Sequence, residues 1–311
     1  MHISKTINVV QPIFFTVSLE ANIPTLQISV PIINRYYQNP SFFIICPAKS
    51  FAYFANALSD YPNVQLVNEE DLMSFASFKK LAQQIGDDLG LTQLSLERLG
   101  WYYQQALKLG FLLNLSQSNF RAVMWDADSI PLAEIKFFDD ANNRSIAYGS
   151  RNEFNVPYFE TIKNIFFTLP EKFYAATIQF FTCTSEERQR LIDRSQKAYP
   201  IQSSESKTIW ISKLIIDSVL KTHGNFSGSF FSEQELVGLS NLLVTPTKAQ
   251  IPLKHLRWGI SGRLSASQML LAKAFNFKHL TYENPSRILS KKQDWKSFVR
   301  LLISETRHFN R

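Results

Sequence analysis

The stretch Arg121-Ala-Val-Met-Trp-Asp126-Ala-Asp128-Ser-Ile-Pro-Leu132 decides how this chain is expected to fold. Its run of four apolar residues predicts a buried strand, which Pro131 stops. Because alternate side chains of an extended segment point the same way, we expect Asp126 and Asp128 to share one face at the strand end. Two such carboxylates repel each other unless a cation or several hydrogen-bond donors join them. A divalent ion that carries phosphate oxygens would satisfy both.

Three interpretations of this Asp-X-Asp pattern are open from the residues alone. The aspartates can be turn residues that cap neighbouring amides. Asp126 can be the nucleophile of a phosphohydrolase with Asp128 as the acid, although Ser129 stands where that class usually has Thr or Val. The pair can also hold Mn²⁺ or Mg²⁺ against the diphosphate of a nucleotide sugar.

The segment before the strand has the pattern of a helix that runs directly toward the aspartates. Residues 99–109 read LGWYYQQALKL. Trp101, Gln104 and Lys108 follow one another at spacings of three and four, so they can face one site together. Lys108 would then neutralise donor phosphate as a point charge. The alternative is a solvated lysine above a packed tryptophan.

Three sequence blocks together resemble a known family. They are GWYYQQALKL at 100–109, VMWDAD at 123–128 and FSEQELVG at 231–238. In this order they are similar to the DUF6492-type glycosyltransferases of the GT-A fold. The resemblance implies an α/β protein with a mostly parallel central sheet flanked by helices and a less regular C-terminal acceptor-side half. It also implies sugar transfer from a nucleotide sugar, with a UDP-sugar expected, to a glycan or lipid-linked acceptor in surface polysaccharide biosynthesis.

The resemblance also implies roles for single residues. Asp128 should contact the metal ion, Mn²⁺ or Mg²⁺, directly, and Asp126 should share in that site while lying nearer the ribose. At 176–182, where the family usually has paired histidines, the chain reads ATIQFFT, so that their role would pass to Gln179 or be absent. A further departure is Val237, which stands where the family usually carries Tyr.

Two glutamates and one histidine complete the candidate site. Ser232 can cap a helix that begins with Glu233 and Glu235, and the helix dipole alone would explain acids there. A base that activates an acceptor hydroxyl must be a carboxylate or a histidine, so we expect Glu235 in this role and Glu233 as second choice. GT-A enzymes often draw a further metal ligand from a C-terminal histidine, for which His255 is the best candidate; a structural histidine is the alternative.

Strand-like and helix-like segments alternate along the first half, which predicts a mostly parallel sheet. The expected strands are 7–10, 42–46, 64–67, 146–148 and 175–182, besides the strand before the aspartates. The expected helices are 25–37, 50–58, 69–85, 156–169 and 185–199, besides the two already described. Ligands of parallel sheets bind beyond the carboxyl ends of the strands, where Asp126 and Asp128 lie.

Length and composition favour one continuous domain. The 311 residues are 45% apolar, which provides ample material for a core. We expect a donor half at 1–132, an acceptor half at 133–284 and a basic helix at 285–311. No apolar run is long enough to span a bilayer and the first residues lack a signal peptide, so we expect a cytoplasmic protein. Cys46 and Cys183 are expected to be buried free thiols.

The positive charge is concentrated at the end of the chain. From residue 285 onward there are seven Lys or Arg and two acids, a balance of +5 within a net charge of +7. The apolar residues of this segment recur at helical spacing: Trp295, Phe298, Val299, Leu302 and Ile303. We expect this helix to dock on the core; attachment to the anionic inner face of a membrane is the alternative. Nucleic-acid binding is not expected, because no recognised module accompanies the charge.

Overall fold

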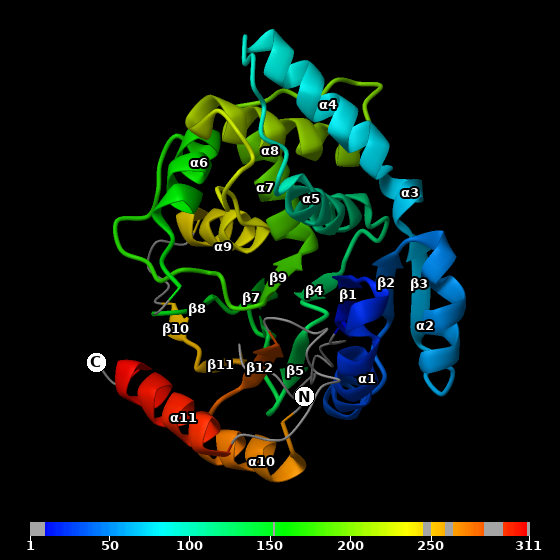
Figure 1. The fold of residues 1–311 in the computed structure, drawn as a ribbon, viewed down its shortest axis with the longest axis vertical. Coiled ribbons are helices and arrows are strands. Elements are labelled where there is room, and N and C mark those ends of the chain that lie inside the picture. Colours follow the sequence, from blue (N-terminus) through cyan, green and yellow to red (C-terminus); the bar gives the residue numbers. More distant parts are fainter. Residues whose placement is uncertain (1–9, 152, 245–249, 259–263, 283–294, 310–311) are drawn as a thin grey trace, which may run out of the picture.

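The computed structural model describes residues 10–151, 153–244, 250–258, 264–282 and 295–309. At its centre is a five-stranded sheet in the order β3-β2-β1-β4-β9 (Figure 1). Its strands are β1 (Ile13–Val17), β2 (Phe42–Cys46), β3 (Val64–Asn68), β4 (Arg121–Trp125) and β9 (Phe180–Thr184). The first four are parallel and β9 is antiparallel to β4. The predicted fold class, a mostly parallel sheet flanked by helices, is confirmed.

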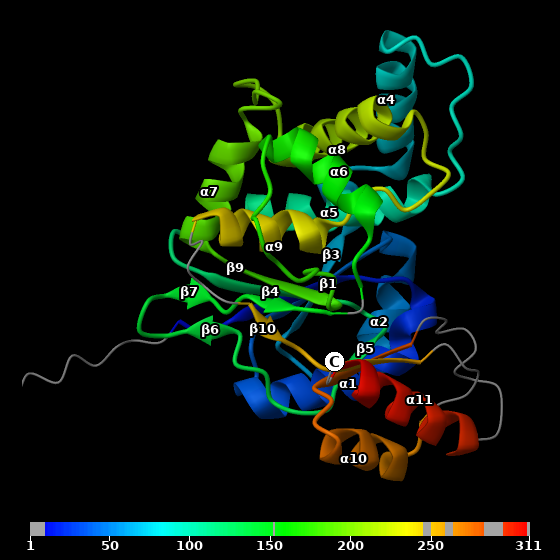
Figure 2. The same cartoon turned by 90° about the vertical axis from the view of Figure 1, so that its left-hand side faces the viewer.

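Helices cover both faces of this sheet (Figure 2). One face carries α3 (Glu69–Leu72), α4 (Phe75–Asp88), α5 (Leu99–Asn114), α6 (Val156–Phe166), α7 (Ser185–Ser195), α8 (Lys207–His223) and α9 (Glu233–Val244). The other carries α1 (Ile23–Tyr37) and α2 (Phe51–Ala57). Because side chains alternate along a strand, the neighbours Phe14 and Phe15 enter different cores, Phe14 beneath α1 and Phe15 beneath α5.

A second, smaller sheet continues directly from the aspartates. β5 (Ser129–Pro131) pairs with β12 (His279–Tyr282), which also pairs with β11 (His255–Trp258). With α10 (Ala266–Ala274) and α11 (Trp295–Phe309) this sheet encloses a third apolar core. Short pairs complete the fold: β6 (Phe138–Asp139) with β7 (Arg144–Ser145), and β8 (Tyr148–Gly149) with β10 (Ile251–Pro252).

Several predicted boundaries differ from the structure. The predicted strand 7–10 lies almost wholly outside the described residues, and the first described strand is Ile13–Val17, whose apolar run pairs on both edges. Within the predicted strand 175–182 only the part from Phe180 is a strand, because Gln179 has a φ of 66° and breaks the extended conformation. In place of the predicted strand 146–148 there is a two-residue strand, Tyr148–Gly149.

The predictions about the cysteines and the C-terminal helix can also be compared with the structure. Cys46 and Cys183 are buried and free. Phe298 and Leu302 of α11 pack into the third core, so this helix docks as predicted, whereas residues 285–294 of the same segment lie outside the described residues. In the described part of the chain, none of the helices has the length and apolar composition that crossing a bilayer requires.

Candidate functional site

A polar cleft of about 550 Å³ opens at the carboxyl ends of β1 and β4. In the order β3-β2-β1-β4 the sheet grows from β1 in both directions, so the connections that leave β1 and β4 diverge and leave a crevice between them. Val17 is the last residue of β1 and Asn22 follows that strand, Asp126 and Asp128 follow β4, and all four line the cleft. The topology of the sheet therefore explains why the cleft lies where the aspartates are.

The two aspartates lie in a tight turn rather than in the strand itself. β4 ends at Trp125, and the backbone N–H of Ser129 donates to the carbonyl of Asp126 at 3.0 Å. The buried Trp125 indole supports this turn by donating to the Ser129 carbonyl at 2.9 Å. From the small sheet, the N–H of Tyr282 donates to the carbonyl of Asp128 at 2.9 Å. The expected common location of both carboxylates is confirmed, but a turn achieves it.

Lys108 joins the second and third sequence blocks. Its Nζ lies 2.6 Å from Oδ1 of Asp126 and 2.8 Å from Oε1 of Glu233. Burial would lower the pKa of this lysine, but the charges of Asp126 and Glu233 outweigh burial and raise it. Burial raises the pKa of Glu233, against the opposing effect of Lys108. The site therefore has a permanent internal cation, held by two carboxylates from different parts of the chain.

Gln234 supports the same arrangement, and the sequence analysis did not find it. Its Nε2 donates to Oδ2 of Asp126 at 2.9 Å, and its Oε1 accepts from the N–H groups of Ile178 and Gln179, both at 2.9 Å. Gln105 accepts from the N–H of Glu233 at 2.9 Å. Both glutamines are buried. The sequence signal that points to them is a polar residue at a position where the pattern of an apolar helix predicts burial.

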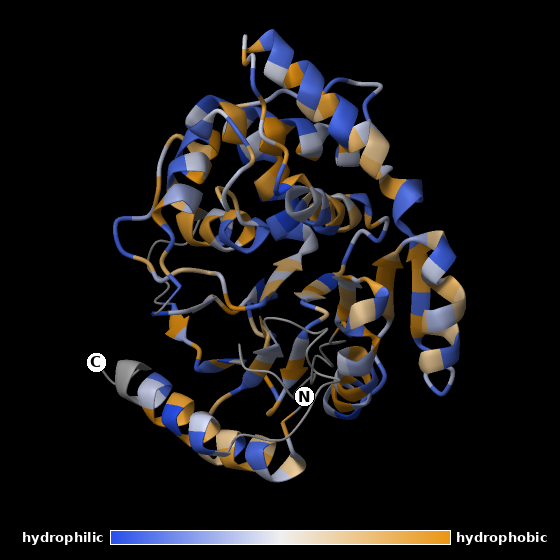
Figure 3. Ribbon diagram, viewed as in Figure 1, coloured by the Kyte–Doolittle hydropathy of each residue, from blue (hydrophilic) through white to orange (hydrophobic). Residues whose placement is uncertain are grey.

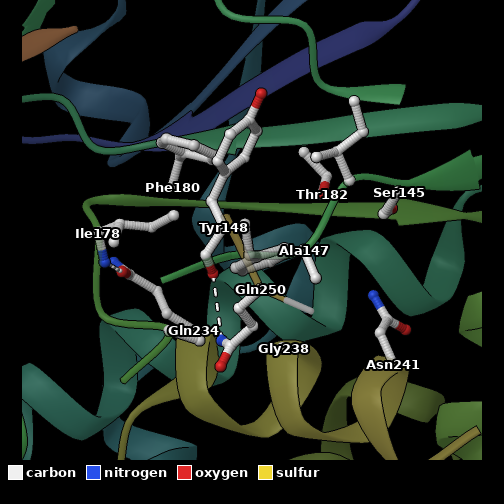
Figure 4. Close-up of a pocket in the computed structure, with 13 residues that line it drawn as sticks. Ser145, Ala147, Tyr148, Ile178, Phe180, Thr182, Gln234, Gly238, Asn241 and Gln250 are labelled. Carbon is white, nitrogen blue, oxygen red and sulfur yellow. Dashed lines mark hydrogen bonds between the residues drawn. The ribbon is translucent and has the colours of Figure 1, made fainter. Parts of the chain in front are cut away.

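A small cavity lies on the far side of Gln234 (Figure 4). It measures about 40 Å³, and Tyr148, Phe180 and Gly238 are among its lining residues. Gln250 closes one side and donates to the carbonyl of Tyr148 at 3.4 Å. A space of this size holds a few water molecules and no sugar or nucleotide. It belongs to the packing behind the cleft.

Asp128 differs from Asp126 in its surroundings. The two oxygens of Asp126 accept from Lys108 and Gln234, one each, at 2.6 and 2.9 Å, whereas the Asp128 carboxylate accepts a longer hydrogen bond, of 3.4 Å, from the hydroxyl of Ser129. Within the described residues Asp128 has no ion pair. Burial, followed by the charge of Asp126, raises the pKa of Asp128 to about 7. A cation bound beside Asp128 would therefore stabilise its ionised form.

Glu235, the expected base, is not brought to the cleft. Its side chain is fully buried; Oε2 accepts from the N–H of Ala176, and Oε1 accepts from the N–H and hydroxyl of Thr177, all within 2.9 Å. Gly238, one turn further along α9, lies against Ala176, where an added Cβ would collide. This position favours a role in holding the segment before β9. Burial raises the pKa of Glu235 to about 7.

We expect Glu235→Gln to destabilise the fold by about 1–3 kcal/mol, because its amide N–H₂ would face the N–H of Ala176 and leave it without an acceptor. Transfer activity per folded molecule should change less than tenfold. Thermal unfolding and activity assayed well below the melting temperature test this. A large loss of turnover in a variant as stable as the wild type would restore Glu235 as the base.

His255 is likewise separate from the aspartates. It lines a neighbouring cavity of about 140 Å³, stacks on His279 with ring centroids 5.2 Å apart, and has Nε2 at 3.7 Å from Glu153. Arg257 forms two hydrogen bonds with the same Glu153, at 2.7 and 2.8 Å, and this pair borders both cavities. The structure does not bring His255 together with Asp126 and Asp128.

Aromatic side chains also line the cleft and form what we call its aromatic rim. Trp101 and Tyr158 stack with ring centroids 6.2 Å apart and an interplanar angle of 22°. The guanidinium of Arg98 lies 5.1 Å from the centre of the Trp101 ring. Gln104 lines the same region, so the predicted group of Trp101, Gln104 and Lys108 does face one site. Such a rim offers both an apolar ring face and a positive charge to a polar ligand.

The donor set fits a divalent ion that arrives with phosphate. Among the described residues there is no cluster of three or more His, Cys, Asp or Glu that could hold a metal ion. Ions such as Mg²⁺ are often held by one or two carboxylates, with phosphate oxygens and water as the other ligands. Asp128, with Asp126 beside it, provides this kind of half-site, since it lines the cleft and forms no ion pair among the described residues.

No family model matches this chain, and no curated protein matches it either. Among solved structures, mouse xyloside xylosyltransferase 1 in its apo form aligns at 11% identity over 90% of this chain and 99% of that one, with a TM-score of 0.43. The galactosyltransferase LgtC, in complex with donor and acceptor sugar analogues, aligns at 11% identity over 94% and 95%, with a TM-score of 0.44. An active-site mutant of LgtC aligns at 13% identity over the same shares, with a TM-score of 0.46. At this distance, the function has to be argued from the site itself.

Proposed function

We propose that the chain is a glycosyltransferase that moves a sugar from a nucleotide-sugar donor, with a UDP-sugar expected, to a glycan or lipid-linked acceptor. The observation that carries the proposal is Asp128, a carboxylate without an ion pair among the described residues, in a polar cleft at the carboxyl ends of β1 and β4. Such crevices bind nucleotides in open α/β sheets. Surface polysaccharide biosynthesis is proposed from the sequence resemblance alone.

The donor diphosphate would lie between the turn after β4 and Lys108. Asp128, supported by Asp126, would hold Mn²⁺ or Mg²⁺ against it, and the ion when bound would stabilise negative charge on the leaving diphosphate. Lys108 has three N–H donors, of which two point to Asp126 and Glu233, so the third is left for a phosphate oxygen or water. Gln234 fixes the other oxygen of Asp126 and so keeps the carboxylate aligned.

The acceptor would enter over the aromatic rim. Trp101 and Tyr158 offer ring faces on which the apolar face of a sugar can pack, and Gln104 and Asn155 beside them can hydrogen-bond its hydroxyls. Glu233 lines the same cleft and shares Lys108 with Asp126, at 2.8 Å from the Nζ of this lysine. We therefore propose Glu233, rather than Glu235, as the carboxylate that orients the acceptor hydroxyl and accepts its proton.

We expect Glu233→Gln to lower kcat by about 10²–10⁴-fold, the usual contribution of a general base. The amide should keep a hydrogen bond from Lys108, so the melting temperature and the KM of the donor should change little. Steady-state kinetics over a range of pH tests this. A fall in donor affinity with unchanged kcat would instead assign Glu233 to donor binding.

The alternative of an aspartyl phosphohydrolase has less support from the geometry. The two oxygens of Asp126 each accept a hydrogen bond, from Lys108 and Gln234, and these bonds hold the carboxylate in place and reduce its nucleophilicity. Absence of a phosphoenzyme after incubation with simple phosphate esters would agree with this argument.

The test of the proposed function is thermal stabilisation by UDP, GDP, CMP and their sugars, each with and without Mn²⁺. Stabilisation by one nucleotide diphosphate that depends on Mn²⁺ would identify the donor class. Slow release of free sugar from the matching donor would then show catalysis, since water can replace an absent acceptor. Binding without any release would favour a non-catalytic nucleotide-sugar-binding protein, and no shift with any nucleotide would contradict the proposal.

A further inference from the structure

The last two helices carry an apolar surface that the core does not cover. Phe298 and Leu302 of α11 are 0% and 1% exposed and pack into the third core. Beside this inner face, Trp295, Val299 and Ile303 are 42%, 37% and 42% exposed. These three residues lie four positions apart and therefore form one continuous stripe along the helix. α11 therefore exposes apolar side chains in addition to those that pack into the third core.

Basic side chains border this stripe. Successive residues of an α-helix are rotated by about 100°, so Lys296 and Arg300 follow Trp295 and Val299 around α11, on the side away from Phe298. Both basic residues are exposed. Around the helix the order is therefore buried face, exposed apolar stripe, basic stripe.

The neighbouring helix α10 extends the same end of the molecule (Figures 1 and 2). Leu270 on this helix and Phe275 just after it are 66% and 41% exposed, and Lys273 between them is exposed as well. Figure 3 shows apolar and polar residues side by side along both helices. Exposed apolar groups and lysines thus recur on two adjacent elements.

We propose that α10 and α11 form a surface that binds an anionic lipid bilayer. Exposed apolar side chains of an amphipathic helix enter the boundary between headgroups and acyl chains, and neighbouring basic residues attract anionic headgroups. A two-fold contact of a second copy through this face would place the basic residues of both copies at one interface, and the repulsion between their like charges opposes it. The proposal does not depend on the reaction in the cleft.

The test uses the full chain with two kinds of vesicle, phosphatidylcholine alone and phosphatidylcholine mixed with phosphatidylglycerol. Co-sedimentation should show binding to the anionic vesicles, and added salt should weaken it. Lys296→Gln with Arg300→Gln should weaken binding about 25-fold, because each basic residue near an anionic surface contributes about a factor of five. Trp295→Ser with Ile303→Ser should weaken it by at least about tenfold.

The matched control lies on α4, at the opposite end of the molecule (Figure 1). There Phe75 is 41% exposed and is followed by the exposed Lys79 and Lys80. Lys79→Gln with Lys80→Gln removes the same charge as the α11 variant and should leave vesicle binding within twofold of the wild type. All substituted side chains are at the surface, and thermal unfolding checks that each variant is folded.

Several outcomes would overturn the proposal. They are no binding to anionic vesicles, equal binding to both kinds of vesicle, and equal losses in the α4 and α11 variants. Sedimentation equilibrium tests the remaining possibility, that a second copy of the chain binds to this face. If the protein forms a dimer that Trp295→Ser abolishes, and vesicles do not bind, the stripe is a contact between two copies.

Discussion

Replacing Asp128 by Asn is expected to abolish transfer while making the metal-free protein more stable. Turnover should fall by about 10³-fold, because the Asn side chain cannot carry the charge that holds a divalent ion against the diphosphate. Stabilisation by the nucleotide diphosphate with Mn²⁺ should disappear. In the absence of metal, the variant should gain on the order of 2 kcal/mol at pH 8, since a buried charge beside Asp126 is removed.

The pH dependence of that gain follows from the pKa of Asp128. Burial and the charge of Asp126 raise this pKa from its usual value of 3.8 to about 7, so the folded state binds this proton more tightly than the unfolded state. The wild type therefore loses stability as pH rises from about 4 to about 7, and Asp128→Asn does not. The difference should be near zero at pH 4 and full above pH 7. Urea unfolding at several pH values measures it.

A matched control separates this effect from a general loss of negative charge. Asp217 on α8 forms an ordinary (i, i+4) pair with Lys221, and Asp217→Asn should change stability by less than about 1 kcal/mol and leave activity intact. If Asp128→Asn keeps turnover within tenfold of the wild type, Asp128 does not hold the catalytic ion. If, without metal and above pH 7, Asp128→Asn is no more stable than the wild type, the charge of Asp128 does not destabilise the metal-free protein.

The three sequence blocks do meet in space, but their order along the chain could not show how. Lys108 from the first block contacts Asp126 from the second and Glu233 from the third, although 125 residues separate Lys108 from Glu233. Sequence spacing indicated that Trp101, Gln104 and Lys108 can face one site together. It did not indicate that the lysine is neutralised by a second carboxylate, because that contact depends on how α9 packs across α5.

The choice between Glu233 and Glu235 shows where periodicity helps and where it stops. Residues two positions apart on a helix are rotated by about 200°, so only one of the two glutamates could face the cleft. That much was available from the sequence. Which one faces it depends on Gly238 lying against Ala176, a tertiary contact that turns Glu235 toward the segment before β9. The prediction for His255 failed for a similar reason, since its side chain lines a neighbouring cavity although Arg257 of the same strand reaches the cleft.

Removal of Lys108 should have the largest effect on stability. Lys108→Met leaves Asp126 and Glu233 without their common cation, and breaking a buried ion pair in this way costs about 3–5 kcal/mol. Loss of this size is a large part of the stability of an ordinary domain. Urea unfolding at neutral pH should show the full loss. The loss should shrink as pH falls, because burial raises the pKa of Glu233 and its protonation removes one of the uncompensated charges.

Two further variants test whether the loss of stability comes from the charge of Lys108. Lys221→Met, on the exposed (i, i+4) pair with Asp217, should cost less than about 1 kcal/mol. The triple variant Lys108→Met, Asp126→Asn, Glu233→Gln removes all three charges together and should recover most of the lost stability, since neutral groups of similar size replace the ionic ones. Activity should not return, because Asp126 and Glu233 are needed in the cleft. A triple variant as unstable as Lys108→Met would show that the methylene packing of the lysine, and not its charge, holds α5, β4 and α9 together.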